Sequence, residues 1–140
     1  MSAPGVRLSK GNRETLNQGA LELNGRFRFN GASDPTSFVG GWISSVAHTG
    51  TGIWTITMKA PFIKNIGVFS RHVSLELDAS ANSTVSFGPI SLSAGTIVVR
   101  VYTDAGTSAL ADIAAGSNAG NWCHLTLILK KSKQRDGSGL

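Results

Sequence analysis

The sequence predicts an all-β protein, an antiparallel β-sandwich of jelly-roll-like organisation with an extended N-terminal arm. Apolar, β-branched and aromatic residues recur with period two in short runs, which is the pattern of half-buried strands. The 17 glycines outnumber the 4 prolines and supply tight turns between these runs. The chain has 140 residues, of which 41% are hydrophobic, and this is enough for one domain with one core.

The first predicted strand covers residues 21–29, where apolar and polar positions alternate. A turn is expected directly after it, because residues 30–35 read Asn-Gly-Ala-Ser-Asp-Pro. We therefore expect an amphipathic strand with a charged outer face. Its core-facing positions are Leu21, Leu23, Phe27 and Phe29, and its outer positions are Glu22, Asn24, Arg26 and Arg28.

A hairpin is predicted next, with strands over 44–48 and 53–58 and a Thr-Gly-Thr-Gly turn between them. In the second strand Trp54, Ile56 and Met58 share one parity and are expected to face the core. The turn is not a phosphate loop, because no Gly-Lys-Ser/Thr follows it and the next element is a strand.

Two further strands are predicted over 69–79 and 85–90. Val73, Leu75 and Leu77 occupy the core-facing parity of the first. The second is interrupted by Gly88-Pro89, and because proline cannot donate to a strand ladder we expect it at a sheet edge. Glu76 and Asp78 share an outer parity, where a solvated surface and an acidic site are both open interpretations.

The last two predicted strands, 96–103 and 122–130, are the richest in β-branched and aromatic residues. In the final strand Cys123, Leu125, Leu127 and Leu129 form an uninterrupted apolar face. Trp122 and Ile128 lie on its opposite face and are candidates for contacts buried between copies of the chain. A long connection separates the two strands, and one helical turn over 109–115 is possible within it.

The net charge of +5 is concentrated at the two ends of the chain. Residues 1–19 are interpreted as an extended arm, 20–130 as the sandwich and 131–140 as a basic, flexible tail. Basic ends on a nearly neutral body suggest contacts with an acidic surface, although a disordered solubilising tail remains the alternative for the arm. The candidate partner-binding residues at the ends are Arg7, Lys10, Arg13, Lys130, Lys131, Lys133 and Arg135.

Residues that carry chemistry are sparse. His48, His72 and His124 are the only histidines, and none stands at a metal-ligand spacing. Cys123 is the only cysteine, so no internal disulfide can form, and its three in-phase leucines predict a buried thiol. We predict that the protein is not an enzyme and that it has no catalytic residues, cofactor or metal site.

Membrane insertion and sequence-specific nucleic-acid binding are not predicted. No run approaches the roughly 18 apolar residues of a membrane helix, and the N-terminus lacks a secretory apolar region. Most aromatics fall on core-facing positions, whereas an RNA-binding sheet would expose them among basic residues. We expect a soluble protein made in a cytoplasm, with non-specific contact to phosphates possible only through its ends.

Several blocks of the chain together resemble a family of small structural proteins of tailed bacteriophages. The blocks are residues 49–57, 96–101, 112–115 and 121–130, and the resemblance lies in their order and spacing. Members of this family resemble capsid decoration (cement) or head-fibre β-sandwiches, which are usually trimeric and clamp neighbouring major capsid subunits. The resemblance spans about residues 47–132 and implies nothing for the two ends.

The expected function is therefore that of a virion structural protein, a capsid decoration protein made in the host cytoplasm and carried on the capsid. Its expected partners are the major capsid protein and two further copies of itself in a homotrimer. The alternative is a receptor-binding, carbohydrate-binding domain of a phage head or tail fibre. Trp42 and Trp54 are the aromatics considered for a glycan, although the inward parity of Trp54 favours a core role.

Overall fold

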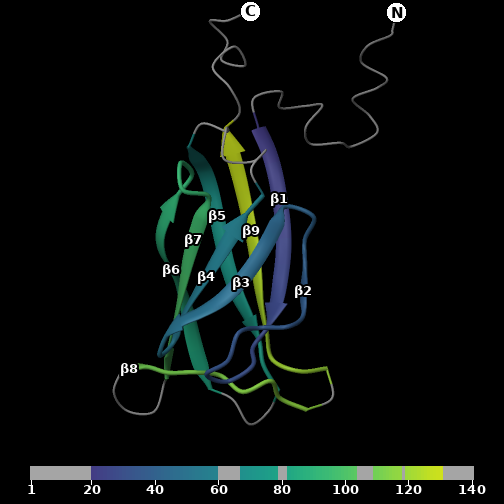
Figure 1. Ribbon diagram of the computed structural model, residues 1–140, viewed down its shortest axis with the longest axis vertical. Helices are drawn as coiled ribbons and strands as arrows, with labels where there is room; N and C mark the ends of the chain where they lie inside the picture. Colours follow the sequence, from purple (N-terminus) through teal and green to yellow (C-terminus); the bar gives the residue numbers. More distant parts are fainter. Residues whose placement is uncertain (1–19, 60–66, 79–81, 104–108, 118, 131–140) are drawn as a thin grey trace, which may run out of the picture.

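Two antiparallel sheets pack face to face in the computed structural model, which describes residues 20–59, 67–78, 82–103, 109–117 and 119–130 (Figure 1). The prediction of an all-β antiparallel sandwich is thus confirmed. The strands are β1 (Ala20–Arg28), β2 (Phe38–Val39), β3 (Ile43–Gly50), β4 (Ile53–Met58), β5 (Val68–Glu76), β6 (Ser83–Ser91), β7 (Thr96–Thr103), β8 (Ala109–Leu110) and β9 (Trp122–Lys130).

The chain passes repeatedly from one sheet to the other. One sheet has the order β2-β1-β9-β5, and the other has the order β3-β4-β7-β6 with β8 paired to the end of β7. The β3–β4 and β6–β7 pairs are hairpins within a sheet, whereas the connections from β4 to β5, β5 to β6 and β7 to β9 change sheet. Because neighbouring segments lie in opposite layers, neither sheet can form its inner face without the other.

The core between the sheets is built from the alternate residues of the strands. Three aromatic rings meet at its centre, with the Phe27 and Phe29 centroids 5.2 Å apart and those of Phe29 and Trp54 4.8 Å apart, both edge to face. The buried hydrophobic residues are Leu23, Phe27, Phe29, Trp42, Ile43, Val46, Trp54, Ile56, Met58, Ile97, Val99, Val101, Ile113, Cys123, Leu125, Leu127 and Leu129.

The period-two predictions agree with the observed strands. The hairpin is present as β3 and β4, and the ranges predicted for the last two long strands coincide with β7 and β9. Gly88-Pro89 lies at a register shift in β6, which is an edge strand as predicted. Strand β5 is shorter than expected, because it ends at Glu76 and leaves Leu77 and Asp78 outside it.

The helical turn considered for residues 109–115 is wrong. Ala109 and Leu110 instead form β8, which pairs with Tyr102 and Thr103 of β7. The Ala111 amide donates to the carbonyl of Val101, so a neighbouring strand accepts a hydrogen bond that a helix would have taken internally.

A glycine allows β1 to pass close to β3. A Cβ on Gly25 would lie 2.8 Å from Ile43 Cδ1 and 3.0 Å from Trp42 Cζ2, so a larger residue would require these side chains to shift. The indole Nε1 of Trp42 donates to the Asn24 carbonyl at 2.8 Å across the same contact. Trp42 is therefore a core residue that also hydrogen-bonds the backbone of β1.

The described domain runs from Ala20 to Lys130, apart from its internal gaps. The predicted arm (1–19) and the predicted tail (131–140) lie outside the described residues, and their structures stay predictions. In the part of the chain that is described, no helix is long and apolar enough to cross a membrane.

Shortening Phe29 to alanine should remove the ring between Phe27 and Trp54. We expect Phe29→Ala to lower the free energy of unfolding by about 3–5 kcal/mol, because a buried cavity replaces an aromatic side chain. The matched control is Phe38→Ala on β2, where the ring is 37% exposed and the loss should stay near 0.5 kcal/mol. Urea unfolding followed by tryptophan fluorescence measures both, and equal losses would contradict the assignment of the core.

Candidate functional site

The chain enters and leaves the sandwich at one end. Ala20, the first residue of β1, pairs with Lys130, the last residue of β9. Lys130 is exposed, and its amide donates to the Gly67 carbonyl at 3.2 Å. Lys59 is also exposed, and it directly follows the last residue of β4, Met58. We call this the terminal end of the sandwich.

For the basic candidate residues of the two chain ends, the structure shows only where their segments join the domain. They lie outside the described residues, and the segments that carry them join the domain at the paired residues Ala20 and Lys130. Both segments therefore start from adjacent points at the terminal end. The residues concerned are Arg7, Lys10, Arg13, Lys131, Lys133 and Arg135.

Carboxylates gather at the opposite end, which we call the loop end. It is formed by the connections between β1 and β2, β3 and β4, β5 and β6, and β8 and β9. Arg26 and Arg28 also lie toward this end, so it carries charges of both signs. The described carboxylates at the loop end belong to Asp34, Glu76, Asp78 and Asp112.

Trp122 lies on the outer face of β9 and is only half-buried. Its indole Nε1 donates to the Ala119 carbonyl at 2.6 Å, and the guanidinium carbon of Arg26 lies 4.5 Å from the ring centroid. One face of the indole is therefore covered by an arginine of the same sheet.

Ile128 lies on the same face of β9, between Glu22 of β1 and Ser70 of β5. It lies six positions beyond Trp122, which is about 20 Å along a strand. Two polar contacts lie between them: Thr126 Oγ1 to Asn24 Oδ1 at 2.8 Å, and His124 Nε2 to Glu76 Oε1 at 2.8 Å. The structure thus places Trp122 and Ile128 on one face without joining them into one apolar patch, and their role in a trimer stays a prediction.

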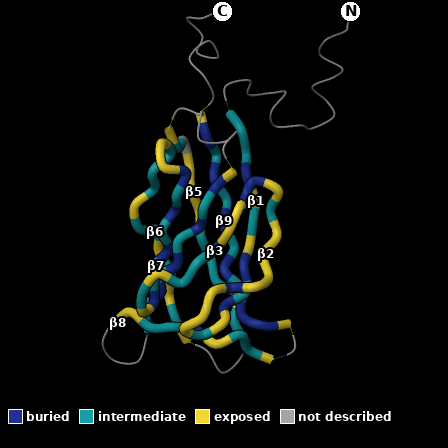
Figure 2. The backbone as a smooth tube through the Cα atoms, in the orientation of Figure 1, coloured by how far each residue is buried: buried dark blue, intermediate teal, exposed yellow. Residues whose placement is uncertain are grey.

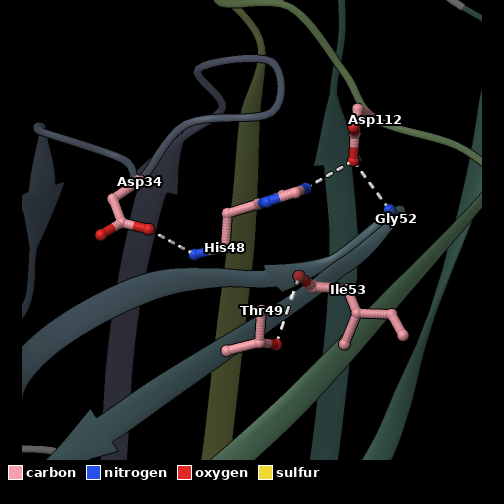
Figure 3. A network of polar contacts seen from close by, with 6 residues as sticks. All are labelled: Asp34, His48, Thr49, Gly52, Ile53 and Asp112. Carbon is pink, nitrogen blue, oxygen red and sulfur yellow. Dashed lines mark hydrogen bonds and ion pairs between the residues drawn. The ribbon is translucent and has the colours of Figure 1, made fainter.

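His48, Asp112 and the β3–β4 turn form a polar network at the loop end (Figure 3). His48 Nε2 lies 2.7 Å from Asp112 Oδ1, and the same oxygen accepts the Gly52 amide at 2.7 Å. The His48 backbone amide donates to Asp34 Oδ1 at 2.8 Å. Two loops distant in sequence are thereby held against β3.

The Asp112 carboxylate is favoured in its charged form. Partial burial acts to raise the pKa of Asp112, but the hydrogen bonds from the Gly52 amide and the His48 ring, together with the charge of His48, lower it below its ordinary value. The carboxylate therefore serves as an acceptor that ties the β8–β9 connection to the turn.

The hydrogen bonds of this network join the β1–β2 connection, the β3–β4 turn and the β8–β9 connection. Within the described residues its members are two backbone amides, an imidazole and two carboxylates, and no hydroxyl or thiol is hydrogen-bonded to the His48 ring. Among the residues that the structure describes, no group of three or more His, Cys, Asp and Glu side chains is arranged to hold a metal ion.

A second polar cluster at the loop end was missed by sequence reasoning. Arg28 Nε donates to the Ala115 carbonyl at 3.1 Å, and its NH2 nitrogen donates to the Gly116 carbonyl at 3.0 Å. The buried Asn121 accepts the Asp78 amide at 2.7 Å and donates to the Ala114 carbonyl at 3.1 Å. Arg28 thus hydrogen-bonds the β8–β9 connection. Its parity predicted an outer-face position, but its guanidinium group binds the backbone of the same chain.

The open interpretation of Glu76 and Asp78 as an acidic pair is also settled by geometry. Glu76 contacts His124 on the outer face, whereas Asp78 lies beyond β5 and its Oδ2 accepts the Ser117 amide at 3.3 Å. The two carboxylates have different partners. They do not form one site.

Cys123 is fully buried in the core-facing row of β9. Burial raises the pKa of its thiol, because the thiolate would lose its hydration. The predicted burial of this cysteine is confirmed. Trp42 and Trp54 are buried as well, so neither offers a face to a glycan.

Comparison with protein-family models, with curated proteins and with solved structures gives no match to this chain.

Replacing Asp112 by asparagine should weaken the fold at neutral pH. We expect Asp112→Asn to cost about 1–3 kcal/mol of unfolding free energy, because charge-assisted hydrogen bonds from Gly52 and His48 are lost. The folded pKa is lowered, so the stabilisation is present above the unfolded pKa and disappears as the pH falls through the folded value. Urea unfolding should show a difference in unfolding free energy between the wild type and Asp112→Asn at about pH 7, and this difference should shrink below about pH 4. A difference that does not depend on pH would contradict this role.

Proposed function

We propose that this chain is a virion structural protein, a capsid decoration (cement) protein that binds the major capsid protein as a homotrimer. The observation that carries the proposal is the pairing of Ala20 with Lys130, which attaches both basic chain ends to the same end of the sandwich. A domain built in this way can be anchored through one end by two basic segments. An acidic shell surface is the partner that this charge distribution fits.

Multivalency provides the energetic reason for a trimer. Two segments per copy give six short contacts per trimer, and after the first binds the others bind at a high effective concentration. Each contact can be weak while the assembly as a whole is stable. Such a protein is made in the host cytoplasm and resides on the capsid, and it performs no reaction and needs no cofactor or metal.

The strand order supports a jelly-roll type of sandwich. The first and last long strands, β1 and β9, are neighbours in one sheet and β4 and β7 are neighbours in the other, and the connections other than the β3–β4 and β6–β7 hairpins link the long strands across the layers. Without the two-residue strands β2 and β8, this arrangement resembles a jelly roll with fewer long strands than the usual eight. A jelly-roll type of sandwich is the fold that the resemblance to small phage structural proteins implies, and that resemblance itself rests on the sequence blocks.

A receptor-binding domain of a phage fibre is the second candidate. The observation that favours it is the half-exposed group of Arg26, Trp122, His124 and Glu76, which lies toward the loop end. A domain anchored by its terminal end would present this group away from the anchor. Binding of the isolated domain to a glycan array, abolished by Trp122→Ala, would favour this candidate over a cement role.

Deleting residues 1–17 tests the proposal directly. Shells assembled from the major capsid protein encoded by the same genome should bind the full chain, and the deletion should weaken binding by at least about tenfold, which is about 1.4 kcal/mol. The sandwich should still fold, because the deletion ends before Ala20. Co-sedimentation with shells measures binding, and circular dichroism reports the fold.

A charge-matched pair of variants separates location from total charge. The first double variant combines Lys131→Ser with Lys133→Ser in the segment that follows β9. The second combines Arg26→Ser in β1 with Arg100→Ser in β7. Each removes two positive charges, but only the first changes a basic chain end. The first pair should weaken shell binding and the second should leave it nearly unchanged. Equal effects of both pairs, or binding to duplex DNA that survives removal of both chain ends, would contradict the proposal.

A further inference from the structure

Two asparagines of the chain are followed directly by glycine. Asn24-Gly25 lies within β1, and Asn30-Gly31 lies in the turn that follows this strand. Asparagine before glycine is the pair that deamidates most readily in proteins, because glycine has no side chain to shield its amide nitrogen. Both asparagines are exposed. Any difference in their reactivity must therefore come from the structure around each pair.

The pair in β1 is held in an extended strand. Gly25 is paired with Leu125 of β9, and a Cβ added to it would lie 2.8 Å from Ile43 Cδ1. The side chain of Asn24 is fixed as well, because its Oδ1 accepts a hydrogen bond from Thr126 Oγ1 at 2.8 Å. Joining the side chain of Asn24 to the nitrogen of Gly25 would require both residues to leave the strand.

The pair in the turn has open surroundings. Residues 30–39 are mostly exposed, and much of the loop end is yellow or teal in Figure 2. Gly31 has a φ of 63°, and a Cβ added to it would meet no atom within 4 Å. The Nδ2 of Asn30 donates to the Asp34 carbonyl at 3.2 Å. There is space at this turn for the ring that deamidation forms.

One hydrogen bond restrains the nitrogen that would react. The Gly31 amide donates to the carbonyl of Ile113 at 2.8 Å. Ile113 belongs to the β8–β9 connection, and the neighbouring Asp112 accepts the Gly52 amide of the β3–β4 turn. While these contacts hold, the Gly31 nitrogen keeps its proton on an acceptor and cannot attack a carbonyl carbon. Local opening of the connection releases it.

We propose that Asn30 is a site of spontaneous deamidation, whose rate is set by the opening of the β8–β9 connection. The Gly31 nitrogen gives its proton to a base in the solvent and bonds to the side-chain carbonyl carbon of Asn30. The bond from that carbon to Nδ2 breaks, and the side-chain nitrogen leaves as ammonia. Water then opens the resulting succinimide at either of its carbonyls, which leaves aspartate or isoaspartate at position 30.

The modification changes the loop end irreversibly. It adds one negative charge beside Asp34 and removes the donor that Asn30 supplies to the Asp34 carbonyl. Isoaspartate also inserts a methylene into the backbone directly after Phe29, which is buried in the core. The turn is therefore expected to hold the β8–β9 connection less firmly as the protein ages. This inference is independent of the proposed function, because it requires neither a shell nor a second copy of the chain.

Incubation of the folded full chain at mildly alkaline pH tests the site. Peptide mapping by mass spectrometry follows the conversion of each side-chain amide to an acid, and an isoaspartyl methyltransferase detects isoaspartate. Asn30 should react at least about tenfold faster than Asn24. In guanidinium chloride, where the chain is unfolded, the two rates should be nearly equal. A folded-state rate at Asn30 no higher than that at Asn24, or a difference that persists in denaturant, would overturn the proposal.

A matched pair of variants tests the control by the β8–β9 connection. Asp112→Ala removes the acceptor of the Gly52 amide and should speed the deamidation of Asn30 at least about fivefold, because the connection opens more often. The control is Glu76→Ala, which removes a carboxylate that contacts His124 on the outer face and should leave the rate unchanged. Thermal unfolding confirms that both variants are folded during the incubation.

Hydrogen exchange of the wild type tests the same control without a substitution. The Gly31 amide should exchange more slowly than an unprotected amide, and conditions that speed its exchange should speed the deamidation of Asn30 in proportion. Equal acceleration by Asp112→Ala and Glu76→Ala, or a Gly31 amide that exchanges without protection, would contradict control by the β8–β9 connection.

Discussion

The structure depends on the filling of the space between two sheets by the alternate residues of their central strands. The core-facing row of β9, from Cys123 to Leu129, meets that of β7 together with Phe27, Phe29 and Trp54. Because the chain changes sheet at several connections, each layer can exclude water only when the other is present. Among the residues that the structure describes, no charged side chain is buried in this space.

The same constraint fixes where the chain ends are attached. Strand β1 buries Leu23 and Phe27 while it pairs antiparallel to β9, and that pairing brings Ala20 beside Lys130. The two basic segments therefore leave the domain at neighbouring residues, because β1 and β9 pair along their whole length. At the loop end, side chains of the domain hold the connections in place. These side chains are Asp112, Arg28 and Asn121. The attachment of both chain ends to one end of the sandwich is a consequence of the pairing of β1 with β9.

Period-two alternation was enough to predict the long strands and most of the core, because that pattern is local. The partners of Arg28 and Asp112 were not predictable, since Arg28 contacts residues 87 and 88 positions away and Asp112 contacts a turn 60 positions away. Alternation also could not tell which inward residues remain half-exposed. Val85 and Phe87 have the same parity signal as the buried Val99 and Val101. Their place at a sheet edge was predicted by Gly88-Pro89 and not by the alternation. The structure does not test the basic candidate residues from Arg7 to Arg13 and from Lys131 to Arg135, because it describes only the residues at which their segments join the domain.

The central claim is that the sandwich is anchored through its terminal end. Amide hydrogen exchange of the full chain, free and bound to shells of the major capsid protein encoded by the same genome, tests it most directly. Binding should slow exchange near Ala20, Lys59 and Lys130 and leave the amides of residues 111–117 at the loop end unchanged. Slower exchange at residues 111–117 with no change around Ala20 and Lys130 would contradict the account.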